Sequence, residues 1–357
     1  MRNSRRVVGA VGVLLVVVSG VPGSASQNDR AQRSATSTAT AAVIIPHESW
    51  SCGLPGGIPN PESGTPVFDV TMTLERVADV GTTQYGARTV AIGRGGDVKG
   101  SRLTASVTAG ALDFALTLAN GVVEIEQRLV LLTADGKYIF MRGAGTGPDA
   151  KDVRVVMDFE APNGSDAAWL NTGTYVARRV IDPAAKTMTL RVYDVSSVTA
   201  PAGGGRVVRI SKPAGVPAQP WDYRRVTPGE KPGAQVITER VTLSPSQSVG
   251  PSKHGVRNII PITGGELSGR ITGKVVAAGA DYQNLSPPAT IDAHYLWETS
   301  DGEIVIVRNG GAFGSLAPTF EARVDGKYAW LNAGLFLSSS PQPSPGGVAL
   351  TFTESSR

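Results

Sequence analysis

Two segments of this sequence are copies of one ancestral segment, and this duplication constrains the fold more than any other feature. Residues 66–111 align without a gap to residues 235–280 at a shift of 169, and six glycines and one arginine coincide. Further along, Ala168-Trp169-Leu170-Asn171 aligns with Ala329-Trp330-Leu331-Asn332. The period is too long for a solenoid, and each copy, at about 125 residues, has the size of a complete domain.

We therefore place two domains at residues 66–196 and 235–357, joined by a linker at 197–234 that is rich in Pro and Gly. Within the linker, the run RVVRI at 206–210 is a candidate short strand that returns to the first copy. Because both domains derive from one unit, we expect them to pack together as an intramolecular pseudo-dimer.

The first 26 residues have the three parts of a secretory signal peptide. A basic start with Arg2, Arg5 and Arg6 precedes an apolar run of about fifteen residues and a small-residue end, so we expect cleavage near Ser26. The apolar run is shorter than the roughly 20 residues of a membrane span. We predict a secreted protein without membrane attachment after cleavage. Ser4-Arg5-Arg6 resembles a twin-arginine signal, and an ordinary basic start is the alternative.

Residues 27–65 are rich in Ser, Thr, Ala, Gly and Pro without a sustained period, and we interpret them as a disordered tether. They contain the single cysteine, Cys52, which excludes an intramolecular disulfide and is either free or paired between chains. Loss of the three signal-peptide arginines lowers the formal charge from +4 to +1. Such a nearly neutral chain has no electrostatic basis for binding nucleic acid.

Short β-rich runs separated by turn signals recur in both copies. Two stretches have the pattern of hairpins with Asp-Gly turns at Asp135-Gly136 and Asp301-Gly302, namely VVEIEQRLVLLT-ADG-KYIFMRG and TIDAHYLWETSDGEIVIVRNGG. No stretch of twelve residues shows a helical period with caps. The predicted class is all-β with little helix, either a sandwich or a closed antiparallel barrel, and closure removes exposed sheet edges.

The second copy contains five spaced motifs in order: Gly264-Gly265, Asp292-Ala293-His294-Tyr295, Glu298 to Gly302, Phe320-Glu321 and Tyr328 to Asn332. Residues 235–354 thereby resemble the DUF3237 (UPF0311) family, and the first copy resembles a divergent member with Glu126-Gln127-Arg128-Leu129 at the second motif. The resemblance implies two tandem small β-barrels, similar in shape to allene oxide cyclase and dirigent barrels. It implies a largely undefined biochemical role, and we predict no cofactor. His294 stands where the family usually has Arg.

The second motif supplies our catalytic candidates, Asp292 and His294. Alternate side chains of a strand share a face, so Asp292, His294 and Glu298 lie on one face and Tyr295 lies on the other. Asp292 could orient the His294 imidazole for acid–base catalysis, with Tyr295, Glu298 and Arg308 as ligand-binding candidates. Two interpretations stay open. The face of Asp292 lines a barrel lumen and forms a small-molecule site, or it faces solvent.

Three further residues complete the predicted ligand-binding set, and each has a structural alternative. Trp330 and Asn332 could offer a stacking wall and a hydrogen-bonding amide, or they could be a core tryptophan and a turn-capping asparagine. Asp281 is either an acid in the pocket or a turn residue.

Other chemistries have little support in the sequence. The three histidines, His47, His254 and His294, show no metal-ligand spacing, so we predict no metal site. A serine nucleophile elbow and a phosphate-binding loop are both missing. We predict a protein that binds a small organic molecule and that, if catalytic, is of isomerase or cyclase type. A non-catalytic binding or structural module is the alternative.

Overall fold

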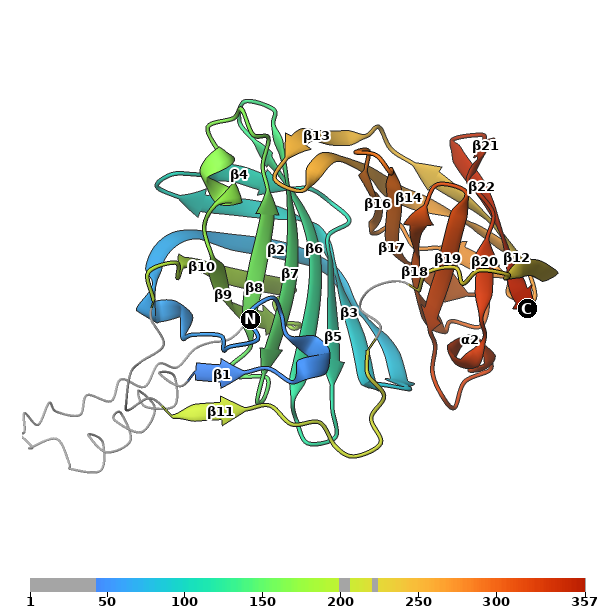
Figure 1. Ribbon diagram of the computed structural model, residues 1–357, viewed down its shortest axis with the longest axis horizontal. Helices are drawn as coiled ribbons and strands as arrows, with labels where there is room; N and C mark the ends of the chain where they lie inside the picture. Colours follow the sequence, from blue (N-terminus) through green and yellow to red (C-terminus); the bar gives the residue numbers. More distant parts are fainter. Residues whose placement is uncertain (1–42, 199–205, 220–223, 357) are drawn as a thin grey trace, which may run out of the picture.

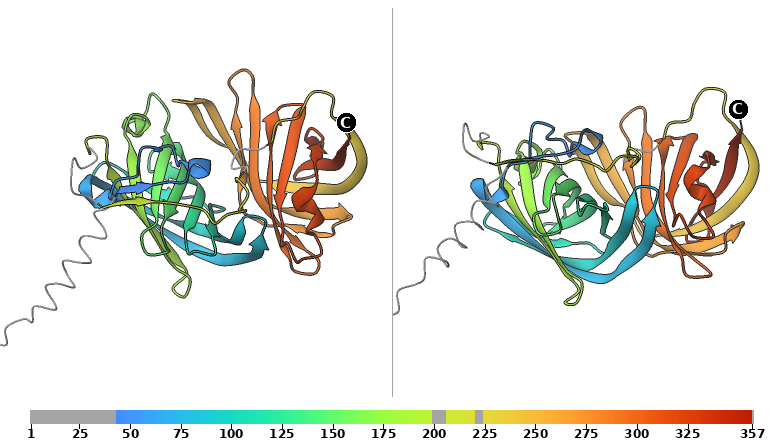
Figure 2. Two further views of the ribbon diagram at one scale, coloured as in Figure 1. Left: turned by 60° about the horizontal axis from the view of Figure 1, so that its bottom comes forward. Right: turned by 90° about the horizontal axis from the view of Figure 1, so that it is seen from below.

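The computed structural model describes residues 43–198, 206–219 and 224–356, which form two antiparallel β-barrels side by side (Figure 1). The two further views in Figure 2 show the same arrangement of the barrels from other directions. The predicted signal peptide at 1–26 lies outside the described residues. Within the described ranges, no helix has the length and hydrophobicity needed to cross a bilayer.

The first barrel is a ring of eight antiparallel strands in which each strand pairs with the next and the last pairs with the first. The strand β4 (Thr104–Val107) also bridges β3 and β6. The order around the ring is β2 (Thr65–Thr83), β10 (Thr187–Asp194), β9 (Tyr175–Asp182), β8 (Arg154–Glu160), β7 (Tyr138–Gly147), β6 (Val123–Thr133), β5 (Leu112–Thr117) and β3 (Gly86–Gly100).

The second barrel repeats this ring with the equivalent strands and closes through the pairing of β12 with β22. The strand β15 (Gly273–Val275) has the place of β4, whereas β13 (Gln247–Ser252) and β21 (Gln342–Ser344) pair at the edges. The order is β12 (Lys231–Leu243), β22 (Gly347–Ser356), β20 (Phe336–Ser338), β19 (Ser315–Glu321), β18 (Ile304–Ala312), β17 (Thr290–Thr299), β16 (Ala280–Asn284) and β14 (Gly255–Gly269). The predicted all-β class with two tandem barrels is confirmed.

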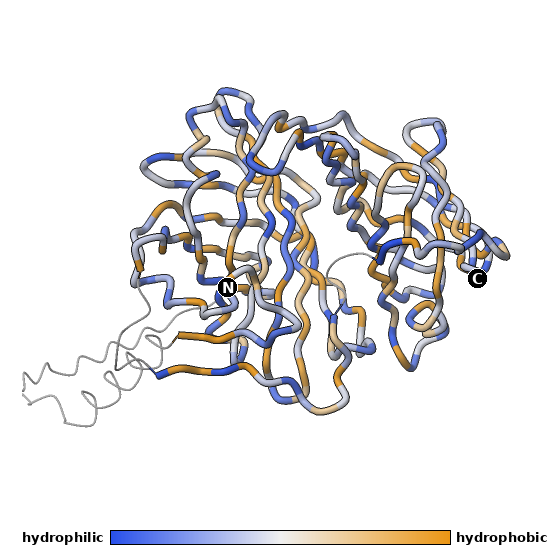
Figure 3. Tube along the Cα trace, viewed as in Figure 1, coloured by the Kyte–Doolittle hydropathy of each residue, from blue (hydrophilic) through white to orange (hydrophobic). Residues whose placement is uncertain are grey.

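Alternation of hydrophobic and hydrophilic residues along the strands produces this architecture, as Figure 3 shows along the chain trace. Ile125, Leu129 and Leu131 of β6 enter the hydrophobic core of the first barrel. The hairpins turn at the predicted Asp-Gly pairs, where Gly136 has φ 79° and Gly302 has φ 87°. Glycine adopts this left-handed backbone without steric cost, which is why it occupies these turns.

The expected tether at 27–65 is packed against the first barrel from Val43 onward, so that prediction is wrong for its second half. The strand β1 (Val43–Ile45) pairs in parallel with β11 (Val207–Arg209), which lies in the run expected to be a short strand. Trp50 is buried in the short helix η1 (Glu48–Trp50), and its indole Nε1 donates to the Gly145 carbonyl at 2.8 Å. Cys52 is buried and free. A few apolar residues fix this segment because the barrel offers them a matching outer face.

The outer walls of the two barrels contact each other through a buried apolar layer. Phe114 and Val90 of the first barrel join Leu296 and Ile306 of the second in one hydrophobic cluster. Equivalent positions of the two copies also meet directly, because Gly279 N–H donates to the Gly110 carbonyl at 2.8 Å. The interface therefore covers the outward faces of β5 and β6 and of β16 to β18.

Candidate functional site

The structure places Asp292 and His294 neither in a lumen nor in solvent, but against the other barrel. Tyr295 and Trp297 belong to the core of the second barrel, so the alternate side chains of β17 point outward. His294 is fully buried there, with Nε2 at 2.6 Å from Asp292 Oδ1 and Nδ1 at 3.5 Å from Glu126 Oε1 of the first barrel. Barrel closure decides which face is inside, and the sister barrel then buries the outer one.

Asp292 and His294 form part of a buried ionic network between the barrels. Arg308 lies directly opposite His294 in the β17–β18 register, and it contacts Glu321 at 2.7 Å and Glu126 at 3.3 Å. Burial alone would raise the pKa of Asp292, but the neighbouring His294 lowers it below its usual value. Arg128 adds a second guanidinium, 3.0 Å from Glu126 and 3.8 Å from Asp292, so each of these buried carboxylates has a basic partner, which suits a structural contact between the two copies.

Two reciprocal ion pairs flank the network. The Arg88 guanidinium of the first barrel makes a two-pronged contact with Glu321 of the second, at 2.8 and 3.0 Å. Arg257 of the second barrel makes the same contact with Glu160 of the first, at 3.1 and 2.8 Å. Arg88 and Arg257 are equivalent in the duplication, as are Glu160 and Glu321. Such mutual exchange is typical of an interface between two copies related by a twofold axis.

A separate cavity of about 140 Å³ lies in the lumen of the second barrel and is lined mostly by apolar side chains. Its polar members include Asp281, Gln283 and Asn309. Asp281 Oδ2 accepts from Gln283 Nε2 at 2.7 Å, whereas Asp281 Oδ1 has no hydrogen-bond partner among the described residues. Burial raises the pKa of Asp281 to about 7. A carboxyl that is half protonated near neutral pH, beside an apolar space, is a candidate for proton transfer.

A second buried carboxyl lies inside the second barrel, on the same face of β12 as the core residues Ile237 and Val241. Glu239 of β12 accepts from the Tyr295 hydroxyl at 2.5 Å and from Trp297 Nε1 at 2.8 Å. Burial raises the pKa of Glu239 to about 7, although both hydrogen bonds oppose the rise. Tyr295, a predicted ligand-binding residue, lines the lumen cavity, and its hydroxyl is held by Glu239. Glu239 orients the tyrosine wall of the cavity.

In the first barrel, the equivalent lumen position is occupied by a salt bridge. Asp113 pairs with Gln127 across β5 and β6, just as Asp281 pairs with Ala293 across β16 and β17. Gln127 Nε2 and the Arg179 guanidinium both donate to Asp113, at 2.6 Å and at 2.5 to 2.8 Å. The methyl group of Ala293 is too short to bond to Asp281. The second barrel therefore keeps an open lumen cavity and a carboxyl oxygen without a hydrogen-bond partner among the described residues.

The remaining predicted ligand-binding residues lie apart from the lumen cavity. The Arg270 guanidinium lies over the Trp330 ring, 4.0 Å from the ring centroid, and the same ring packs edge-on against Phe336. Asn332, in the short helix α2 (Trp330–Ala333), exchanges two hydrogen bonds with the Ala322 backbone at 2.8 and 2.9 Å. Asn171 makes the same pair of bonds in the first copy, so the asparagine closes a turn. Glu298 holds Arg76 and Lys274.

Asp281 and Tyr295 thus meet in one cavity, whereas Asp292, His294 and Arg308 meet in the barrel interface. Sequence reasoning missed Glu239, Gln283 and Asn309. The signal that could have identified the cavity is the alignment of Gln127 with Ala293, a large lumen side chain replaced by a small one. Among the described residues, no three His, Cys, Asp or Glu side chains converge as they would around a metal ion.

Comparisons with known proteins identify the family of this chain. A model of the family described as a protein of unknown function (DUF3237) matches residues 62–198 and 234–317. A UPF0311 protein of Bradyrhizobium diazoefficiens is 36% identical over 129 residues, which cover 29% of this chain and 84% of that protein. A UPF0311 protein of Rhodopseudomonas palustris is 44% identical over 79 residues, covering 21% of this chain and about half, 52%, of that protein.

A hydroalkoxylation enzyme of Penicillium herquei is 29% identical over 99 residues, covering 27% of this chain and 66% of the enzyme. Among solved structures, a β-barrel-like protein of Acinetobacter baumannii has 21% identity and a TM-score of 0.33, covering 37% of this chain and 94% of its own. An enzyme from Penicillium herquei has 23% identity and a TM-score of 0.31, and the match covers 38% of this chain and 99% of the enzyme. On the evidence of its two matched segments and its curated relatives, the chain belongs to the DUF3237 family, as a tandem duplication.

Proposed function

We propose that the second barrel binds a small, largely apolar organic molecule in its lumen, and that Asp281 exchanges a proton with it in a reaction of isomerase or cyclase type. The observation that carries this proposal is a carboxyl oxygen without a hydrogen-bond partner among the described residues, on a side chain that lines a mostly apolar cavity. Because burial raises the pKa of Asp281 to about 7, the group can give or take a proton at neutral pH.

The size of the cavity limits the ligand. An apolar cavity of about 150 Å³ in a protein core holds one benzene ring, and the lumen cavity measures about 140 Å³. Phe313, which is 50% exposed, lines the same cavity and brings it close to the surface. A ring-sized apolar part of the ligand would therefore be enclosed, while the rest extends past Phe313.

The Penicillium herquei relative named as a hydroalkoxylation enzyme suggests one balanced form of this chemistry. Protonated Asp281 donates its proton to one carbon of a C=C bond, and a hydroxyl oxygen of the same molecule forms a C–O bond to the other carbon. The hydroxyl proton then returns to the Asp281 carboxylate. The product is an isomer of the substrate, and the enzyme is regenerated without a co-reactant.

Binding and turnover can be tested with 2-allylphenol, which carries a hydroxyl and an alkene in one molecule. Ala293→Gln introduces the side chain that fills the equivalent position of the first barrel, and we expect it to abolish binding measured by ligand-observed NMR. Asp281→Asn should retain binding and abolish formation of the cyclic ether, followed by mass spectrometry. Asp292→Asn and His294→Gln serve as controls outside the lumen. Equal binding by wild type and Ala293→Gln would refute the lumen site.

The alternative is a non-catalytic binding or structural module. The specific observation in its favour is that Asp292, His294 and Arg308, all in or near the family motifs, are used in contacts between barrels. Retained binding of 2-allylphenol without any Asp281-dependent product would support this alternative. Failure of binding altogether would count against a lumen site for either function.

We also propose that the two barrels are an intramolecular pseudo-dimer and that the protein is exported. The reciprocal pairs Arg88–Glu321 and Arg257–Glu160 support the first proposal, and the composition of residues 1–26 supports the second. Expression of residues 235–357 alone tests the pseudo-dimer, because a soluble, well-folded monomer would contradict an obligatory contact. A cleaved mature form in the culture medium would support export.

A further inference from the structure

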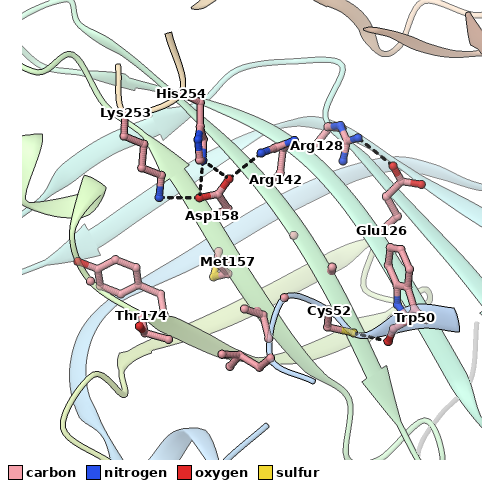
Figure 4. Close-up of a pocket in the computed structure, with 17 residues that line it drawn as sticks. Trp50, Cys52, Glu126, Arg128, Arg142, Met157, Asp158, Thr174, Lys253 and His254 are labelled. Atoms are coloured by element: carbon pink, nitrogen blue, oxygen red, sulfur yellow. Dashed lines mark hydrogen bonds and ion pairs between the residues drawn. The ribbon is translucent and has the colours of Figure 1, made fainter. Parts of the chain in front are cut away.

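A second and larger cleft, of about 510 Å³, lies outside both lumens where the barrels meet. Its walls come from three parts of the chain: the outer face of β6 to β8, the N-terminal segment around Trp50 to Leu54, and the tip of the β13–β14 hairpin with Lys253 and His254. Figure 4 shows these side chains converging from both barrels. Each barrel alone would present only part of this cleft.

Lys253, Arg142 and His254 surround one carboxylate on the inter-barrel side of the cleft. Asp158 lies 2.5 Å from Lys253 Nζ, 2.8 Å from Arg142 Nη2 and 3.1 Å from His254 Nε2. These three side chains remain 23%, 39% and 44% exposed, respectively. Burial would raise the pKa of Asp158, but Lys253 and Arg142 hold it below its usual value, so Asp158 stays ionised. One carboxylate thus contacts three donor side chains, and each of these side chains is still partly exposed in the cleft.

Arg128 adds a buried donor to the same cleft. Its side chain is 9% exposed, and its Nη2 lies 3.0 Å from Glu126. The Nε of Arg128 has no hydrogen-bond partner among the described residues, and the same holds for the Nε of Arg142. Burying a guanidinium N–H without an acceptor is costly. Both Nε atoms are buried, so a ligand in the cleft would contact the terminal nitrogens of these guanidinium groups.

The opposite wall of the cleft is apolar. Trp50, Leu54, Ala144 and Val156 line it and belong to one hydrophobic cluster on the outer face of the first barrel. Figure 4 places Trp50 and Cys52 across the cleft from Asp158 and His254. An aromatic or aliphatic body would fit this wall, while a charged end would face the cations.

The equivalent cleft of the other copy lacks this arrangement. It measures about 220 Å³, and there Gln84 and Tyr85 take the places of Lys253 and His254. Thr319 pairs with Arg308 across the strands as Asp158 pairs with Arg142, so the central carboxylate is missing as well. The other cleft has Arg224, Arg308 and Glu321 in its lining instead. The cluster of Asp158 with Lys253 and His254 is therefore a property of one cleft and does not follow from the fold that both copies share.

We propose that the inter-barrel cleft binds a small organic carboxylate, whose anionic end contacts Arg128, Arg142 and the Lys253–His254 tip while its apolar body packs on Trp50 and Val156. A carboxylate offers acceptors in the plane that a guanidinium requires. This site is distinct from the lumen and does not depend on the function proposed for Asp281.

The probe is 4-fluorobenzoate, titrated into the full chain and followed by fluorine NMR, with neutral 4-fluorobenzyl alcohol as its matched control. We expect the wild type to bind the benzoate at least 10-fold more tightly than the alcohol. The double variant Lys253→Gln/His254→Tyr installs the tip of the other copy and should weaken benzoate binding at least 10-fold. Lys99→Gln, which removes an exposed positive charge elsewhere, should leave it unchanged.

Asp281→Asn and Ala293→Gln separate this site from the lumen, because both should bind 4-fluorobenzoate like the wild type. A loss of binding in Ala293→Gln would assign the probe to the lumen and overturn the proposal. Absence of binding by the wild type, equal binding of the alcohol, or unchanged binding by the double variant would each overturn it too. Circular dichroism melts of every variant verify that the fold is retained.

Discussion

The titration of Asp281 predicts an unusual dependence of stability on pH. Burial in the lumen raises the pKa of Asp281 from 3.8 to about 7. Between these two values, the folded protein keeps a proton that the unfolded chain has released. The free energy of unfolding therefore contains a contribution that is complete below about pH 4 and is lost as the pH rises through about 7.

Asp281→Asn removes this titration while keeping the shape of the side chain. A shift of about three pKa units corresponds to about 4 kcal/mol at most, since each unit is worth about 1.4 kcal/mol. The stability of the variant relative to the wild type should accordingly rise by about 2–4 kcal/mol between pH 4.5 and pH 8. Glu239, whose pKa is also about 7, titrates in both proteins and cancels in this difference.

Urea unfolding of both proteins at four pH values, followed by tryptophan fluorescence, measures the difference directly. Asp97→Asn, on an exposed side chain of the first barrel, controls for the loss of one negative charge. Free energies of unfolding that run parallel with pH in the wild type and in Asp281→Asn would refute the assignment of a buried, protonated carboxyl to this cavity. If the stability of Asp281→Asn relative to the wild type falls as the pH rises, the sign of the prediction is refuted.

Three further substitutions test the packing of the barrels. Asn332→Ala removes two hydrogen bonds to a turn backbone and should cost about 1–3 kcal/mol in urea unfolding; an unchanged midpoint would contradict the capping role. Gly279 and Gly110 both have positive φ, +79° and +89°, so alanine strains the backbone at either position. Gly279→Ala should lower the melting temperature more, because its new Cβ would lie 2.0 Å from a β17 carbonyl, whereas that of Gly110→Ala meets nothing closer than 3.6 Å. Equal effects would argue against close contact at this point. Arg257→Ala leaves Glu160 buried without its ion pair and should destabilise by about 3–5 kcal/mol, and a loss below 1 kcal/mol would mean that the pair is not maintained in solution.

Much of the fold could be predicted because its information is local and is present twice. Alternating residues, Asp-Gly turns and the alignment of the copies indicated paired antiparallel strands, and the rings of eight strands follow this plan. The site was harder to predict. Asp292 and His294 were correctly placed on a common strand face and lie 2.6 Å apart, but their surroundings were not predictable. Asp281 has a carboxyl oxygen without a hydrogen-bond partner among the described residues, because the residue opposite it on the neighbouring strand is Ala293.

The sequence by itself determined the all-β class, the turns and the equivalence of the two copies, because neighbours along the chain and their repeats encode these features. Only the tertiary structure decided which face of each strand is the lumen, since a period of two is the same for either choice. It also decided that the outer face of β17 is buried by a sister barrel and that Trp50 packs on the first barrel. Such burial depends on surfaces that lie far apart in the sequence and meet only once both rings have closed.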